Sequence, residues 1–249
     1  MRDLENPGER RRRSRSLLMA PQAARRSHRN GGHATRRADK SFETRSRILD
    51  AAEELFSRHG IYGVTLRDIA SMADVDTALL HYYFESKRGI FDAVLARRAS
   101  VLNYECNDEL TRYEEEAGKN ITVEGAIAAY VRPVFKLNRT GGKAWRNYCA
   151  IITQLNNSPD WGAEAIATHF DPLARRLIEI LKHALPNADE ADLYWCYHMF
   201  ARTLTVTNAP GDRLERLSSG VCHAGDFEAL EPRLVKFVSE GFRSVCGAK

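Results

Sequence analysis

The sequence lacks the features that mark membrane, exported and disulfide-bonded proteins. No apolar run approaches the roughly 20 residues that a membrane-spanning helix needs, and the charged N-terminus has no apolar segment behind it, so a secretory signal is not expected. The five cysteines are scattered and form no CxxC pair, which predicts reduced thiols filling an apolar core, with redox sensing as the alternative. We therefore expect a cytoplasmic protein with no membrane partner.

Common catalytic and metal-binding signatures are also missing. The sequence contains no HExxH, GxSxG or GxxxxGK motif and no Cys/His set with metal-ligand spacing. Cys196 and His198 lie two residues apart, which on a helix points their side chains in different directions, so a nucleophilic pair is not expected. Strand patterns are nearly absent as well. We expect an all-α protein that is not an enzyme and carries no cofactor or metal.

The segment from Thr65 to Lys87 is the most informative one present, because it predicts two short amphipathic helices joined by a tight turn. Thr65 can cap the first helix, with Asp68 three residues on as a carboxylate variant of the capping box. Asp76 can cap the second helix, and Asp74 takes the left-handed turn position. This geometry can lay one helix in a DNA major groove. The alternative is an ordinary helical hairpin inside a bundle.

The wider window, residues 44–96, contains ILDAAEELF (48–56), HG (59–60), VTLRDIA (64–70), ADV (73–75) and YFESK (83–87). Together these segments resemble the N-terminal domain of the TetR family of bacterial transcriptional repressors. The sequence departs from the family pattern at the turn glycine (Asp74), the second cap (Asp76) and the recognition helix (His81, then Tyr82-Tyr83). These departures leave the expected fold intact but make the operator sequence unpredictable by analogy.

Candidate DNA contacts are concentrated in this segment. They are Thr65, Arg67, Thr77, Ala78, His81, Tyr82, Tyr83 and Lys87. Arg67 has the reach and the fork to bond a guanine edge, the alternative being a solvated surface arginine. The resemblance implies that His81 and Tyr82 contact bases or phosphates, with Tyr83 partly in the core. Lys87 lies at a helix N-terminus, where its side chain and backbone N–H groups can share a phosphate.

Positive charge is concentrated at the N-terminal end. Residues 1–42 carry twelve Lys and Arg against four Asp and Glu, whereas the rest of the chain has a net charge of −4. The segment has too few apolar residues to offset the entropy cost of ordering, so we expect a disordered basic arm. Such an arm could neutralise phosphates or enter a minor groove. The alternative is that translation begins at Met19 and part of the arm is not made.

The remainder of the chain reads as helices. We expect them at about residues 44–58, 87–116, 123–137, 144–155, 161–185 (interrupted or kinked at Asp171-Pro172), 190–207 and 227–245. No internal repeat is present, which disfavours a solenoid. We therefore expect three regions: the basic arm at residues 1–42, a helix-turn-helix DNA-binding domain at 43–90 and a ligand-binding and dimerisation bundle at 91–249.

Large apolar residues with polar tips in the second half suit a pocket for an apolar or amphipathic effector, although each could simply fill a core. The candidate ligand-binding residues are Trp145, Tyr148, Ile152, Trp195, His198, Met199 and Arg202. His198 and Arg202 lie four apart and could hold a carboxylate or carbonyl. Residues 191–200 and 227–234 are weakly similar to TetR-type regulators of fatty-acid metabolism, which implies a fatty acid or acyl-CoA; steroids and aromatic acids are alternatives.

The last two helices carry apolar stripes that can cover their own domain or a twin subunit. The resemblance implies a homodimer through these helices, whose symmetry would place two recognition helices about one DNA turn apart. The expected function is that of a ligand-responsive repressor, bound to double-stranded operator DNA on the bacterial nucleoid and released by its effector. The alternative is a helical-bundle interaction protein without specific DNA binding.

Overall fold

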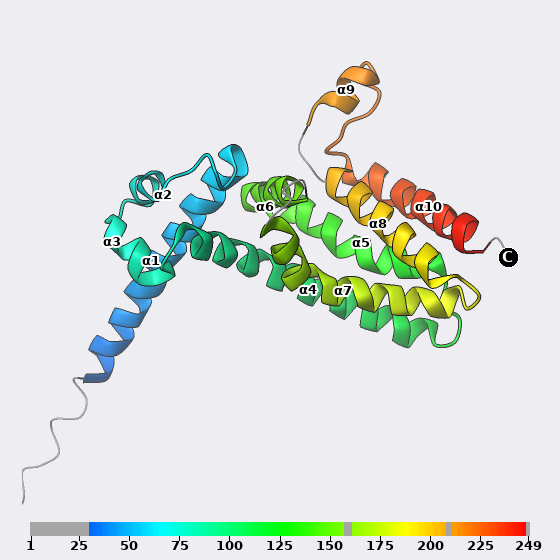
Figure 1. Cartoon of the computed structure of the whole chain (residues 1–249), viewed down its shortest axis with the longest axis horizontal. Coiled ribbons are helices and arrows are strands. Elements are labelled where there is room, and N and C mark those ends of the chain that lie inside the picture. The colour runs from blue at the N-terminus through cyan, green and yellow to red at the C-terminus, as the bar shows by residue number, and fades with distance from the viewer. Residues whose placement is uncertain (1–29, 157–160, 208–210, 248–249) are drawn as a thin grey trace, which may run out of the picture. The chain divides into compact units, whose positions relative to one another are not determined.

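All regular secondary structure in the part of the chain that the structure describes is helical, so the expected all-α fold is confirmed. The computed structural model describes residues 30–156, 161–207 and 211–247 (Figure 1). The helices are α1 (Asn30–His59), α2 (Leu66–Ala73), α3 (Thr77–Phe84), α4 (Lys87–Ala117), α5 (Val123–Thr140), α6 (Gly142–Leu155), α7 (Trp161–Ala184), α8 (Glu190–Thr207), α9 (Arg213–Leu217) and α10 (Phe227–Cys246).

Helix α1 begins earlier than the sequence predicts. The expected start is near Thr44, but the helix begins at Asn30, so residues 30–42 are helical where a segment without regular structure is expected. The expected start is based on composition, which reflects only how much apolar surface a segment can bury. A segment that continues an existing helix also gains one backbone hydrogen bond for each residue that is fixed. The chain divides into two units between Phe42 and Glu43. The disorder expected for residues 1–29 lies outside the described residues.

Local capping chemistry defines the pair α2 and α3. The Thr65 hydroxyl accepts a hydrogen bond from the Asp68 backbone N–H at 3.2 Å, and the Thr65 N–H donates to Asp68 Oδ2 at 2.8 Å, which completes the predicted capping box. Asp74 has φ of 51°, in the left-handed region, and Asp76 accepts from the Ala78 N–H at 2.7 Å. Ser86 caps α4 by accepting from the Gly89 N–H. The turn and cap roles predicted for Thr65, Asp74 and Asp76 are confirmed.

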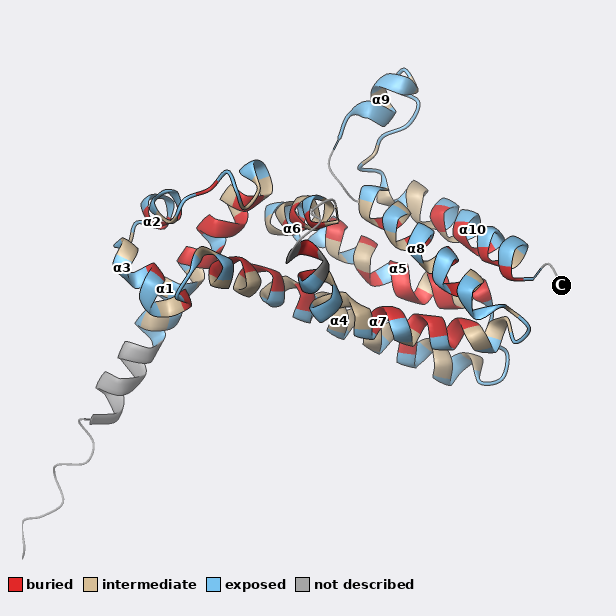
Figure 2. Ribbon diagram, viewed as in Figure 1, coloured by how far each residue is buried: buried red, intermediate tan, exposed pale blue. Residues whose placement is uncertain are grey.

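Two clusters of buried apolar side chains form the core of residues 43–249. The first joins α1, α2, α3 and the beginning of α4 to α6, whose Trp145 and Ile151 are buried in it. The second lies among α5, α7, α8, α10 and the later part of α4. Figure 2 shows the buried residues on the faces that these helices turn toward one another. Helices α4 and α6 contact both groups of helices, so the two cores are not separated by a single boundary in the sequence. The division between residues 43–90 and 91–249 remains a prediction.

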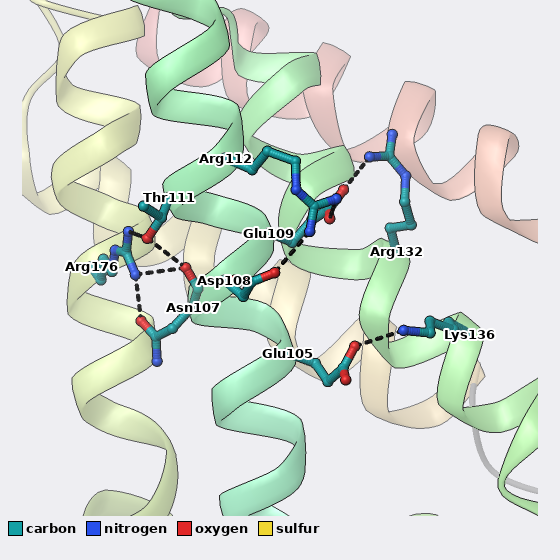
Figure 3. A network of polar contacts seen from close by, with 9 residues as sticks. All are labelled: Glu105, Asn107, Asp108, Glu109, Thr111, Arg112, Arg132, Lys136 and Arg176. Carbon is teal, nitrogen blue, oxygen red and sulfur yellow. Dashed lines mark hydrogen bonds and ion pairs between the residues drawn. The ribbon is translucent and has the colours of Figure 1, made fainter.

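Polar contacts hold the C-terminal half of α4 on two sides (Figure 3). On the α7 side, Arg176 donates to the Asn107 side chain at 2.6 Å and to Glu114 at 2.9 Å. On the α5 side, Glu109 pairs with Arg132, and Lys136 Nζ lies 2.8 Å from Glu105. These contacts link this half of α4 to both α5 and α7.

The remaining helices follow the predicted pattern with local differences. Helix α8 has the predicted bounds, and α5 continues to Thr140. Helix α7 runs through Pro172 without the interruption considered at the sequence level. The short helix α9 is not expected from the sequence, because five residues are too few for an apolar period to show. Within the described ranges, no helix combines the length and apolar character that crossing a membrane requires.

Candidate nucleic-acid interface and internal cavity

The outer face of the α2–α3 pair collects most of the predicted DNA contacts. Leu80 and Phe84 anchor α3 in the core, and this leaves Ala78, His81 and Tyr82 on its exposed side. Tyr82 is 78% exposed, so its ring and hydroxyl are accessible to a partner. Arg67 on α2 is also exposed, and Thr77 is half-buried at the start of α3.

The other predicted contacts lie where this face meets its neighbours. The Lys87 ammonium donates to the Val64 carbonyl at 2.8 Å, which links the start of α4 to the segment entering α2. Two of its N–H groups remain available to a phosphate. Thr65 is exposed but already engaged as the α2 cap. The Tyr83 ring is half-buried against the core and lies edge-on to Tyr82, with ring centroids 5.0 Å apart.

A buried carboxylate fastens α1 to α4. The Glu53 side chain is 3% exposed. It accepts from Arg97 Nη2 at 2.7 Å and from Arg98 Nε at 2.9 Å, while Arg97 also reaches Asp50 at 2.7 Å. Our sequence analysis missed this cluster. The signal available was a glutamate on the apolar face of α1, next in sequence to the buried Ala52.

Helix α1 also contacts α6. Lys143 Nζ lies 2.7 Å from Glu54, and the Gln154 amide donates to the Ser57 carbonyl at 2.9 Å. Helix α6 is therefore in contact with the first helix of the DNA-reading region and also contributes side chains to the interior of the bundle.

A cavity of about 130 Å³, partly open to the surface, lies among α4, α5, α6, α7 and α8. Its lining residues are Leu102, Cys106, Tyr130, Val134, Tyr148, Cys149, Ile152, Asn156, Ile166, Phe170, Tyr197, Ala201, Leu204 and Thr205. No Asp, Glu, Lys, Arg or His is among these described lining residues. Burial raises the pKa of Cys149 to about 11 and of Cys106 to about 12, and it raises the pKa of Tyr148 well above its usual value. All the lining side chains are therefore uncharged near neutral pH.

The predicted ligand-binding residues of α6 gather at this cavity. Tyr148 and Ile152 line it, and the buried Trp145 stacks on Tyr148 with ring centroids 5.1 Å apart. The three predicted ligand-binding residues of α6 therefore lie close together at the cavity.

The four predicted ligand-binding residues of α8 lie elsewhere. His198, Met199 and Arg202 line a wide groove of about 1010 Å³ between α8 and α10, and the neighbouring Trp195 is 64% exposed. Arg202 also donates to the Asn156 carbonyl at 2.5 Å. The seven candidates therefore do not form one site, because α8 turns one face inward and a second, partly apolar face outward.

The outward face of α8 continues onto α10. Met199 on α8 is 51% exposed, and Phe237 on α10 is 70% exposed. Both residues line the groove between the two helices, as does Val245. Exposed apolar residues that cluster in this way typically mark a surface that another molecule covers.

Comparisons with known proteins agree with this architecture. A family model described as "Bacterial regulatory proteins, tetR family" matches residues 48–94, and one described as "Tetracyclin repressor-like, C-terminal domain" matches residues 128–241. Together these matches cover well over half of the chain.

Individual relatives are similar over less than half of the chain. The regulator SrpR of Pseudomonas putida is 36% identical over 77 residues, which are 31% of this chain and 36% of SrpR. The negative transcriptional regulator of the icaADBC biofilm operon of Staphylococcus aureus, IcaR, is 29% identical over 119 residues, covering 46% of this chain and 64% of IcaR. The chain thus spans between about a third and two thirds of these curated relatives.

A solved structure extends the likeness in fold to most of the chain. The transcriptional regulator FadR of Bacillus subtilis, in complex with stearoyl-CoA, superposes with a TM-score of 0.54 at 18% identity, covering 79% of this chain and 98% of FadR. The two family models, the capped helix pair and the helical bundle agree, and the chain belongs to the TetR family of bacterial transcriptional regulators.

Proposed function

We propose that the protein is a repressor that binds operator DNA as a homodimer and leaves it when a small effector enters the bundle. The observation that carries this proposal is the capped α2–α3 pair, whose outer face presents Arg67, His81 and Tyr82 to solvent. Family membership supports it, and so does the description of IcaR as a negative transcriptional regulator. Such a protein would work in the cytoplasm, on the nucleoid while bound to DNA.

Helix α3 is the proposed reading helix. Ala78 and Thr77 are small and permit close approach to base edges, while His81 and Tyr82 supply contacts to bases or phosphates. The α2 N-terminus, capped by Thr65, offers backbone N–H groups and Lys87 offers its ammonium, both suited to phosphate oxygens. Tyr83 takes part chiefly by packing beneath Tyr82.

A second copy of the chain is the proposed partner of the α8–α10 face. A two-fold interface buries the same residues twice, so the exposed Phe237 and Met199 would each be covered in both subunits. The two α3 helices would then lie about 34–36 Å apart, the distance between successive major grooves on one side of DNA. We assign Trp195, His198 and Arg202 to this face, because they lie outside the cavity.

Helix α6 is the proposed link between effector and DNA. Its Tyr148 and Ile152 line the cavity, whereas its Lys143 and Gln154 hold α1. An effector that displaces α6 would therefore strain the contacts that position the reading helices. A coupling free energy of about 1–3 kcal/mol is enough for a useful switch, and it requires DNA and effector to weaken each other's binding reciprocally.

The effector is proposed to be a small apolar or amphipathic molecule, in keeping with the lining of the cavity. A fatty acid or acyl-CoA is one candidate, since FadR, which shares the fold, was solved with stearoyl-CoA. The proposed contacts are Tyr148 and Ile152, with Trp145 supporting the Tyr148 ring.

Selection of genomic DNA tests the proposal as a whole. Purified full-length protein is incubated with fragments of the source genome and an excess of random competitor, and retained fragments are sequenced. We expect enrichment of one or a few sites with two-fold symmetry, and loss of enrichment for Tyr82→Ala. Equal retention of all fragments would favour the alternative, a helical-bundle interaction protein without specific DNA binding.

A further inference from the structure

The polar groups around the internal cavity are almost all satisfied within the protein. The Cys106 thiol donates to the Tyr130 carbonyl at 3.6 Å, and the Cys149 thiol donates to Asn138 at 3.3 Å. The hydroxyls of Tyr130 and Tyr197 interact with each other, and this interaction contributes to the shift in the pKa of both. These groups therefore have little to offer a ligand beyond their apolar surfaces.

The Tyr148 hydroxyl is the exception among the described tyrosines of the lining. Its side chain is 3% exposed, and its oxygen is buried without a hydrogen-bond partner. The pKa of Tyr148 is raised by burial and by the nearby Cys149 and Cys106 thiols. Tyr148 on α6 and Cys106 on α4 both line the cavity. A buried hydroxyl without a partner is costly, and an acceptor brought in by a ligand would remove that cost.

Charge and size restrict what can bring this acceptor. No charged side chain is among the described residues that line the cavity, and the neighbouring Arg202 already donates to the Asn156 carbonyl, so a carboxylate or phosphate inside it would lose its hydration without gaining an opposite charge from the lining. The cavity volume of about 130 Å³ is close to the roughly 150 Å³ of an engineered apolar cavity that holds benzene. The aromatic side chains of Tyr130, Tyr148, Phe170 and Tyr197 can make stacked or edge contacts with one ring.

We infer that the cavity binds a small uncharged single-ring compound with one hydrogen-bond acceptor, and that the Tyr148 hydroxyl donates to this acceptor. This inference rests on the proposed function for its regulatory meaning. It narrows the effector class, because a fatty acid or acyl-CoA brings a charged group that the lining does not neutralise.

Calorimetric titration of the full-length protein with four probes tests the inference. Acetophenone carries a ring and a carbonyl acceptor, ethylbenzene has a similar shape without the acceptor, benzoate is charged, and octanoate represents a fatty acid. We expect acetophenone to bind about tenfold more tightly than ethylbenzene, and benzoate and octanoate to bind at least a hundredfold more weakly than acetophenone.

Two variants identify the donor. Tyr148→Phe keeps the ring, so we expect it to lower acetophenone affinity about tenfold and leave ethylbenzene affinity unchanged, which also shows that the cavity is still folded. Tyr104→Phe removes the hydroxyl of a tyrosine on α4 that is 72% exposed, and it should change neither affinity. An equal effect of Tyr148→Phe on both probes would overturn the role of the hydroxyl.

The result is separable from the proposed function. The inference is overturned if benzoate or octanoate binds more tightly than acetophenone. It is also overturned if neither acetophenone nor ethylbenzene binds, even if the protein selects an operator. Binding of acetophenone by a protein that selects no operator would leave the cavity chemistry in place and refute the regulatory function.

Discussion

The buried Glu53 cluster makes a prediction that depends on which partner is removed. Replacing Arg97 and Arg98 together by Met leaves the Glu53 carboxylate in place, with 3% of its side chain exposed and no positive partner. An unpaired buried charge of this kind costs about 3–5 kcal/mol of unfolding free energy. Replacing Glu53 by Gln should cost only about 1–2 kcal/mol, because the amide oxygen still accepts and Arg97 keeps Asp50.

The combined variant gives the sharpest result. Adding Glu53→Gln to the Arg97→Met/Arg98→Met background removes the unpaired charge, so we expect it to restore part of the lost stability rather than add a further loss. Urea unfolding followed by circular dichroism measures these free energies, at one fixed protein concentration because a dimer's stability depends on concentration.

An exposed ion pair supplies the control. Arg216 and Asp212 are each 73% exposed, so Arg216→Met should change the unfolding free energy by no more than about 0.5 kcal/mol. The reasoning would be refuted if Glu53→Gln were as destabilising as the double arginine variant, or if its effect in that background were a further loss.

Three other predictions follow from the site. Arg67→Ala should cost about 1–3 kcal/mol of operator binding free energy, and the loss should depend on the identity of one base pair. Lys87→Ala should instead weaken binding to all sequences about equally. Competition gel shifts with single-base operator variants measure both effects, and an Arg67→Ala loss that is equal for all variants would show that Arg67 does not read a base. The Thr65 hydroxyl and backbone N–H lower the pKa of Asp68 below 3.8, so the stability that Asp68 adds is present above that value and lost as the pH falls through the lowered pKa. Asp68→Asn should therefore lower the melting temperature at pH 7, and this loss should shrink as the pH falls below 3.8; a loss that does not change with pH would contradict this role of the cap. Phe237→Ser should remove roughly 1.5–3 kcal/mol of apolar burial from each of the two subunits of the dimer. We therefore expect sedimentation to show a dimer dissociation constant that is at least a hundredfold higher. An unchanged dissociation constant would mean that the interface lies elsewhere.

Features set by neighbours in the sequence could be predicted well. The caps at Thr65, Asp76 and Ser86 and the left-handed turn at Asp74 depend on residues two to four positions away, so their chemistry is readable without the fold. The exposed face of α3 could also be predicted, because Leu80 and Phe84 lie four residues apart and define the buried face of this helix.

Features set by distant residues could not be predicted. The Glu53 contacts join positions 44 and 45 residues apart, so the sequence can indicate a glutamate on the apolar face of α1 but not the arginines that pair with it. Helix α8 carries apolar residues on two faces, so its pattern does not tell which face lines the cavity. Tyr197 and Ala201 line it, whereas Trp195 and Met199 face outward. The seven predicted ligand contacts are divided between the cavity and the outer groove for this reason.

The central claim is that two α3 helices of a dimer enter successive major grooves. A hydroxyl-radical footprint on the selected operator measures this most directly. We expect two protected half-sites related by two-fold symmetry, with centres about 10–10.5 base pairs apart, both lost with Tyr82→Ala and both kept with Tyr104→Ala. Protection confined to a single half-site, or protection that survives Tyr82→Ala unchanged, would contradict the claim.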